Sequence, residues 1–111
     1  MGEFMLTIAD AASAGVAFTG APFAFRVIDF YVITTGDPGA NANTYQLQTA
    51  AGAANVSNAV GTNGVGDNAI VRCGTIDDAN HEFAAGVDLQ IDRVKVGGVA
   101  SVIACIVYMR I

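Results

Sequence analysis

The chain has 111 residues, of which 53% are hydrophobic and only 14% are charged, and its formal net charge is −5. Its five lysine and arginine residues are too few to neutralise a run of phosphates, so we expect no direct contact with nucleic acid. The sequence shows no apolar run near the roughly 20 residues of a membrane-spanning helix, no basic amphipathic helix and no basic n-region, so neither a membrane interaction nor a secretory signal is expected. Charged residues are scarce compared with the roughly 25% of an average globular chain, which favours burial of surface against a partner.

The length predicts a single domain. Residues 1–12 are predicted to be an N-terminal arm or first strand, and residues 13–111 a β-sandwich domain. Within the first segment, residues 4–9 have the composition of a short strand. Residues 16–19, at the start of the second segment, form a possible second strand. Pro22 has no amide hydrogen, so it suits the start of the following strand better than its middle.

Residues 23–35 are rich in β-branched and aromatic side chains and predict a central strand. Both of its alternating faces are mostly apolar: Phe23, Phe25, Val27, Asp29, Tyr31 and Ile33 on odd positions, and Ala24, Arg26, Ile28, Phe30 and Val32 on even positions. Residues 99–111 repeat this pattern, with Val102, Ile106 and Tyr108 on one face and Ile103, Cys105, Val107 and Met109 on the other. We therefore expect one face of each strand to form the core and the other to form a subunit interface.

The middle of the chain predicts shorter elements. Residues 44–49 alternate, with Tyr45 and Leu47 opposite two glutamines, as a strand with one solvated face does. Residues 55–60 are compatible with one helical turn that begins at an Asn55 cap and turns two valines inward.

The last third of the chain adds strands at residues 69–73, 81–84 and 87–96. The apolar positions of residues 87–96 change parity, which predicts a β-bulge near Asp92 and Arg93. Gly97 and Gly98 then predict a tight hairpin into the last strand. About eight short strands without a long helix indicate an all-β fold, a single-domain β-sandwich that is jelly-roll-like.

The two cysteines, Cys73 and Cys105, lie in predicted strands. Buried free thiols are the favoured interpretation, since small secreted disulfide scaffolds carry more cysteine than this. A bridge between the two remains open if their strands face each other closely.

No residue pattern predicts catalysis, a metal site or a cofactor. His81 is the only histidine and follows Asp77 and Asp78 in a polar stretch that reads as a solvated turn, with an oxygen-ligand cation site as the less favoured alternative. No serine lies in a nucleophile elbow, and a triad would have one possible base. We therefore predict that the chain is not an enzyme.

Asp29 is an anomaly because a carboxylate in an apolar strand needs a partner if it is buried. Arg26 and Arg72 are the candidates for that partner. Either the pair is simply structural, or it also fixes the register between subunits by penalising wrong docking.

Four segments carry a family resemblance: Phe-Arg-Val-Ile-Asp-Phe-Tyr-Val-Ile at 25–33, Asn-Val-Ser-Asn-Ala-Val at 55–60, Ile-Asp-Asp-Ala-Asn at 76–80, and the closing strand at 102–110. The chain resembles small virion proteins of tailed bacteriophages, particularly capsid cement or decoration proteins. This resemblance implies a β-sandwich or jelly-roll unit, often a trimer, that binds the outer capsid surface and stabilises neighbouring major capsid proteins. It also implies assembly in the host cytoplasm and a final location on the virion.

We therefore expect a homotrimer that also contacts the major capsid protein. Its subunit interface is predicted from the two central strands and comprises Arg26, Asp29, Phe30, Tyr31, Val102, Ile106, Tyr108 and Arg110. The predicted capsid contacts are Phe4, Met5 and Leu6. Two alternatives stay open: a tail spike, tail fibre or head-fibre component, and a carbohydrate-binding β-sandwich module, for which Tyr45 is the candidate sugar platform.

Overall fold

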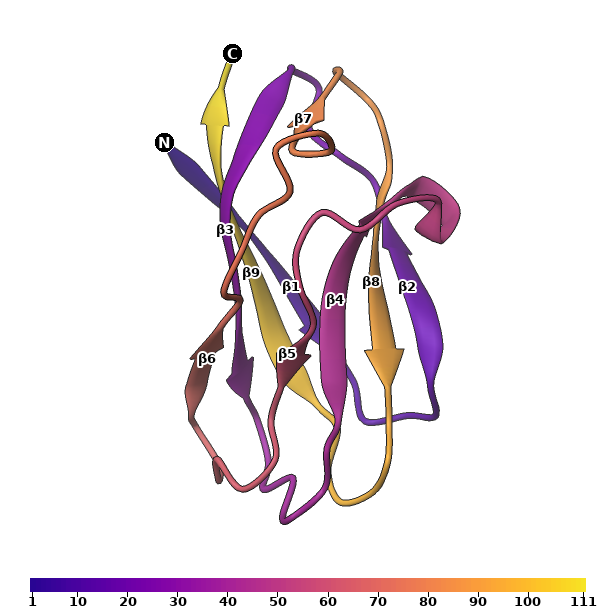
Figure 1. The fold of residues 1–111 in the computed structure, drawn as a ribbon, viewed down its shortest axis with the longest axis vertical. Helices are drawn as coiled ribbons and strands as arrows, with labels where there is room; N and C mark the ends of the chain where they lie inside the picture. Colours follow the sequence, from indigo (N-terminus) through magenta and orange to yellow (C-terminus); the bar gives the residue numbers. More distant parts are fainter.

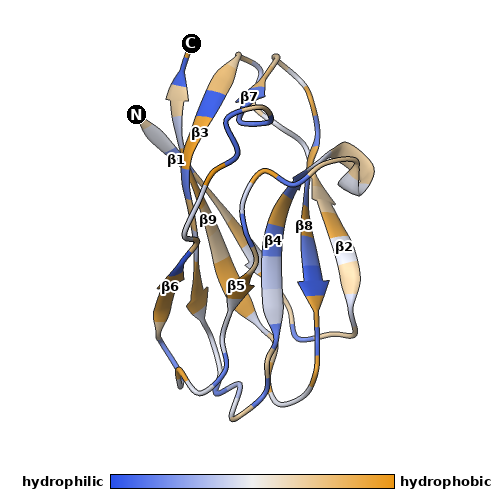
Figure 2. Cartoon of the chain, in the orientation of Figure 1, coloured by the Kyte–Doolittle hydropathy of each residue, from blue (hydrophilic) through white to orange (hydrophobic).

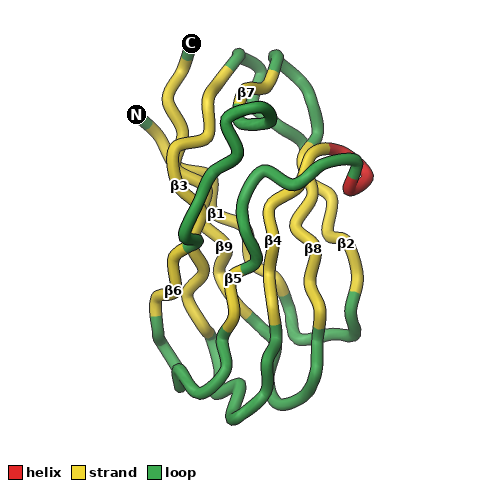
Figure 3. The backbone as a smooth tube through the Cα atoms, viewed as in Figure 1, coloured by secondary structure: helices red, strands yellow, loops and turns green.

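The computed structural model describes residues 1–111, which form two antiparallel β-sheets packed face to face (Figure 1). The nine strands are β1 (Gly2–Ile8), β2 (Ala14–Phe18), β3 (Phe25–Thr34), β4 (Thr44–Thr49), β5 (Val60–Gly61), β6 (Ile70–Arg72), β7 (Glu82–Phe83), β8 (Leu89–Val94) and β9 (Val102–Arg110). The one helical segment is the short 3-10 turn η1 (Ala50–Gly52), which Figure 3 shows at the end of β4. The predicted all-β sandwich is confirmed.

The strand order is that of a jelly roll. Sheet A has the order β1–β9–β3–β6, with β7 also paired to β3, and sheet B has the order β2–β8–β4–β5. Strand β1 thus pairs with β9, β2 with β8, β3 with β6 and β7, and β4 with β5. These pairings correspond to one long antiparallel hairpin that is folded over. Its successive strand pairs belong alternately to sheet A and sheet B, which is the arrangement of a jelly roll.

A bulge in β3 changes which side chains face the core. The register of β3 against β9 shifts between Val27 and Asp29, so Ile28 is the extra residue. Before the bulge the odd positions point inward, and after it Phe30 and Val32 do so and are fully buried. The fixed alternation expected along this strand is therefore wrong beyond Val27, because one inserted residue exchanges the two faces.

Strand β8 contains no bulge, so that prediction is wrong. Its register is regular against both neighbours, and Leu89, Ile91 and Arg93 all point inward. Val94 and Val96, whose apolar character suggested the change of parity, are exposed. The inward position that the sequence pattern assigns to an apolar residue is occupied by the arginine, which is only 6% exposed.

Hydrogen bonds to backbone carbonyls allow Arg93 to be buried. Its guanidinium donates to the carbonyl oxygen of Ala12 at 3.1 and 2.8 Å, and to that of Ala9 at 2.9 Å. These carbonyls belong to the loop that carries the chain from sheet A to sheet B. The arginine therefore fixes the first crossing between the sheets while its charge stays hydrogen-bonded.

The core lies between the two sheets and draws on nearly every strand. Its fully buried large side chains are Phe25, Val27, Phe30, Val32, Tyr45, Leu47, Val56, Val60, Leu89, Ile91, Ile106 and Ile8. The hydroxyl group of Tyr45 donates to the carbonyl oxygen of Ala100 at 2.6 Å, and burial raises the pKa of this phenol to about 12. The predicted division of β4 into a wet and a dry face is confirmed, since its glutamines point outward.

Two local predictions are wrong. Residues 55–60 form no helical turn; the segment runs extended beside β4, with a bridge between Gln48 and Asn55. Gly97 and Gly98 form no tight hairpin, because β8 and β9 belong to different sheets. The connection between them crosses the end of the sandwich and is held by buried Asn43, whose side chain bonds Val96 and Gly97.

Asp10 ties the same crossing to the N-terminal half and gives stability a predictable pH dependence. Its carboxylate accepts hydrogen bonds from Lys95 Nζ at 2.8 Å and from the Ala100 amide at 2.9 Å, and the bond from Lys95 is the main cause of its lowered pKa. A lowered folded-state pKa adds stability above the ordinary pKa of 3.8, and this contribution is lost as pH falls through the folded value.

We expect chemical denaturation of Asp10→Asn to show a smaller loss of stability between pH 5 and pH 3 than the wild type, whereas an equal loss would contradict this role.

Candidate functional surfaces

The outer surface of sheet A, here called the A face, is largely apolar. Its outward apolar side chains are Met5 on β1, Ile28, Tyr31 and Ile33 on β3, Ile70 on β6, and Ile103, Val107 and Met109 on β9, while Cys105 of β9 is fully buried. The register places Ile103, Ile33 and Ile70 in one row across three strands. Figure 2 shows the hydrophobic colouring of β6 and β9 beside the more hydrophilic β4 and β8 of sheet B. The A face therefore carries neighbouring apolar side chains on four adjacent strands.

Charged side chains also lie within the A face, between its apolar residues. Asp29 is paired with Arg72, which confirms the predicted ion pair and selects one of its two candidate partners. Arg26 pairs instead with Glu82 at 2.6 Å, and this hydrogen bond lowers the pKa of the Glu82 carboxyl group.

Tyr31 links two strands on the A face. Its hydroxyl donates to the Glu3 carboxylate on β1, and this bond raises the pKa of the phenol well above its ordinary range. The Arg72 guanidinium lies over the Tyr31 ring, 4.6 Å from its centre. The phenol is thus held at the surface between a cation and an anion, instead of being packed into the core.

Several predicted contact residues are in the interior. Phe30, Val102 and Ile106 are at most 1% exposed, because they point between the sheets. A neighbouring subunit cannot reach these three side chains while the sandwich is closed, so their assignment to an interface is wrong. For Phe30 the error follows from the exchange of faces at the β3 bulge, whereas Val102 and Ile106 lie on the face of β9 that points into the core.

Three more of the predicted contact residues, Phe4, Leu6 and Tyr108, pack on the inner side of sheet A. Phe4 stacks on Tyr108 with ring centres 4.3 Å apart and meets Phe25 edge to face, while Leu6 also packs against the core. Of the three predicted capsid contacts, only Met5 points outward. Arg110 is exposed, and its guanidinium lies 4.2 Å from the ring centre of Phe23.

The predicted residues that do reach the surface of sheet A are Met5, Arg26, Asp29 and Tyr31. Sequence reasoning did not select the apolar residues that lie among them, namely Ile33, Ile70, Ile103, Val107 and Met109. The alternation of the two strands contains this information, but only once the position of the bulge is known.

Both cysteines are free thiols, which confirms the favoured interpretation. Burial raises the pKa of each, so neither is activated as a thiolate. Cys105 lies beneath Tyr31 in the register of the A face, and Cys73 lies 3.8 Å from the Asp29 carboxylate.

The polar stretch around His81 forms a turn. The imidazole lies 4.0 Å from the Asp78 carboxylate and 3.9 Å from that of Glu82. The Asp77 carboxylate instead accepts a hydrogen bond from the Ala79 amide at 2.7 Å. No three side chains among histidine, cysteine, aspartate and glutamate are grouped as a metal site requires.

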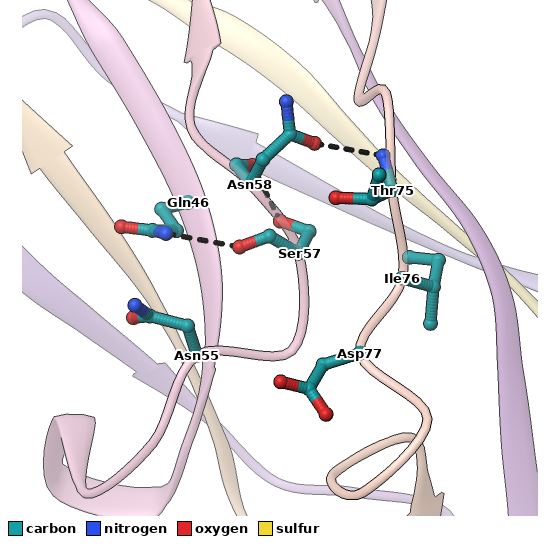
Figure 4. Close-up of a pocket in the computed structure, with 7 residues that line it drawn as sticks. All are labelled: Gln46, Asn55, Ser57, Asn58, Thr75, Ile76 and Asp77. Carbon is teal, nitrogen blue, oxygen red and sulfur yellow. Dashed lines mark hydrogen bonds between the residues drawn. The ribbon is translucent and has the colours of Figure 1, made fainter.

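A polar pocket of about 290 Å³ lies beside β4, as Figure 4 shows. It is lined by Gln46, Asn55, Ser57, Asn58, Thr75, Ile76 and Asp77. Three segments build it: the outer side of β4, the extended segment beside it, and the connection from β6 to β7. A backbone bridge between Ser57 and Ile76 joins the last two segments, so the floor of the pocket is hydrogen-bonded.

No family model, curated protein or solved structure matches the chain. The fold has no helix with the length and apolar character that crossing a membrane requires. Function is therefore inferred from the surfaces and the pocket of the chain itself.

Proposed function

We propose that this chain is a virion structural protein of the capsid cement or decoration type, which assembles as a homotrimer and binds the outer capsid surface. In this role it stabilises neighbouring major capsid proteins, after assembly in the host cytoplasm. The observation that carries the proposal is the A face, where apolar side chains of four adjacent strands point away from the core.

Burial of the A face against other copies would remove exposed apolar surface from water. Met5 and Ile70 are 63% and 60% exposed in the single chain, and Ile28 and Met109 are also exposed. Apolar surface contributes about 25 cal/mol per Å² when it is buried, and contiguous apolar patches on small proteins mark interaction sites. The ion pair of Asp29 and Arg72 lies within the A face, where it is placed to favour one register of such an interface.

The fold and the resembling segments are compatible with this role. Jelly rolls occur in viral capsid proteins, although a fold alone does not assign a function. Two of the resembling segments, 25–33 and 102–110, lie in β3 and β9, the central strands of sheet A. The segments that suggest a capsid role therefore also present the apolar face.

The contact with the capsid is proposed along the free edge of β1, the strand that also carries Met5 on the A face. This strand is an edge of sheet A, so it is accessible along one side. Phe4 and Leu6 support the contact only from behind, since they pack inward. A tail spike, tail fibre or head-fibre component would use the same fold and the same self-association, and it remains the second candidate.

We predict that charge placed on the A face abolishes self-association. The double variant Met5→Lys and Ile70→Lys alters two exposed side chains, so the fold of each chain should be unaffected while the apolar interface acquires unpaired charge. Sedimentation velocity should show the assembled species replaced by a monomer with unchanged circular dichroism.

The matched control is Val96→Lys, which changes an equally exposed valine outside sheet A. This control should keep the wild-type sedimentation coefficient. An A-face double variant that still assembles like the wild type would show that the subunits associate through another surface.

A further inference from the structure

In the polar pocket beside β4, several side chains use only one of their two terminal polar atoms in a hydrogen bond to the protein. Asn58 Oδ1 accepts hydrogen bonds from the amides of Gly74 at 2.7 Å and Thr75 at 3.0 Å. Asp77 Oδ1 accepts one from the Ala79 amide at 2.7 Å. Figure 4 shows the Asp77 carboxylate pointing into the space between the two segments. These bonds leave Asn58 Nδ2 and Asp77 Oδ2, on two exposed residues, without a partner in the protein.

Two more amides, Gln46 on β4 and Asn55 on the segment that carries Asn58, are held in the same way. Gln46 Nε2 donates to the carbonyl oxygen of Ser57 at 2.9 Å, which leaves Gln46 Oε1 free. Asn55 Oδ1 accepts from Gln48 Nε2 at 3.1 Å, which leaves Asn55 Nδ2 free. The lining residues therefore carry two amide donors and two acceptors that make no protein hydrogen bond, so none of the four groups has to give one up to meet a ligand.

The chemistry of the lining selects a class of ligand. No lysine, arginine or histidine lines the pocket, so an anion gains no charge partner there. Asp77 is its single carboxylate, which is too few for a divalent cation that prefers several oxygen ligands. Hydroxyl groups both donate and accept, so adjacent hydroxyls match alternating amide and carboxylate groups.

We propose that this pocket binds a neutral saccharide, with Asn58 and Asp77 hydrogen-bonded to its hydroxyl groups. This differs from the sugar platform expected at Tyr45, which is buried in the core with its hydroxyl bonded to Ala100. The pocket shares no residue with the A face, so the proposal goes beyond the structural role and does not depend on it.

The test is titration of ¹⁵N-labelled protein with glucose, galactose, mannose and N-acetylglucosamine, followed by NMR of the side-chain amides. At least one sugar should produce saturable shifts at Asn58, Asn55 and Gln46. Absence of saturable shifts with all four sugars at millimolar concentrations, or shifts confined to other residues, would overturn the proposal.

Two variants remove a free group and keep the bond that holds the side chain. Asp77→Asn retains the acceptor for the Ala79 amide, and Asn58→Asp retains the acceptor for Gly74 and Thr75. Each should weaken the binding of that sugar about tenfold with little change in stability. Asp88→Asn neutralises an exposed carboxylate outside the pocket and should bind like the wild type. Equal affinity in all three variants would contradict the assigned site.

Discussion

Phe30→Ala is expected to destabilise the folded chain by about 3–5 kcal/mol, the usual cost of removing a buried aromatic side chain from a core. Phe30 is fully buried between the sheets, although the alternation read from the sequence assigns it to the same face as exposed Arg26 and Ile28. Urea denaturation should show the loss as a lower midpoint with an unchanged slope. The melting temperature should fall by more than about 10 °C in a domain of this size.

Tyr31→Ala is the matched comparison, because it removes the neighbouring aromatic ring from the outer side of the same strand. It deletes the bond to Glu3 and the contact with Arg72, both at the surface, and should cost about 1 kcal/mol. A larger loss for Tyr31→Ala than for Phe30→Ala would show that the bulge at Ile28 does not exchange the two faces.

Arg93→Met is expected to cost about 2–4 kcal/mol, because it deletes three hydrogen bonds from a charged group and leaves two carbonyl oxygens unpaired. Methionine retains most of the apolar volume, so the loss reports the guanidinium rather than the packing. The loop around Ala9 and Ala12 should also open, which hydrogen exchange would detect as reduced protection of residues 9–13.

Arg93→Lys and Arg110→Met complete this experiment. A lysine keeps the charge but lacks the fork that reaches both carbonyl oxygens, so Arg93→Lys should recover only part of the loss. Arg110 is exposed over Phe23, and its replacement should cost less than about 1 kcal/mol. An Arg93→Met variant as stable as Arg110→Met would contradict the anchoring role of Arg93.

Much of the fold follows from local pattern, and the errors have specific physical causes. The wet and dry faces of β4 are set by strict alternation, and the turn at Asp37 is set by a carboxylate that bonds the Gly39 amide. The sequence pattern predicts the bulge in β8 rather than in β3, because an arginine at an inward position interrupts the alternation of apolar residues. Only the distant carbonyls of Ala9 and Ala12 make that position acceptable, and no local window contains them.

The surfaces were less predictable than the strands. Asp29 was recognised as needing an arginine, and the pair with Arg72 forms, because a carboxylate in an apolar strand permits few alternatives. The polar pocket was missed entirely, since Gln46, Asn58 and Asp77 lie on three segments that only the jelly-roll winding brings together.

The mass of the wild-type protein assembly in solution tests the central claim most directly. Sedimentation equilibrium over a range of micromolar concentrations should give three times the 11.3 kDa mass of one chain, because trimer formation buries the A face. A single species with the mass of one chain at every concentration would contradict the proposal that this face is an assembly surface.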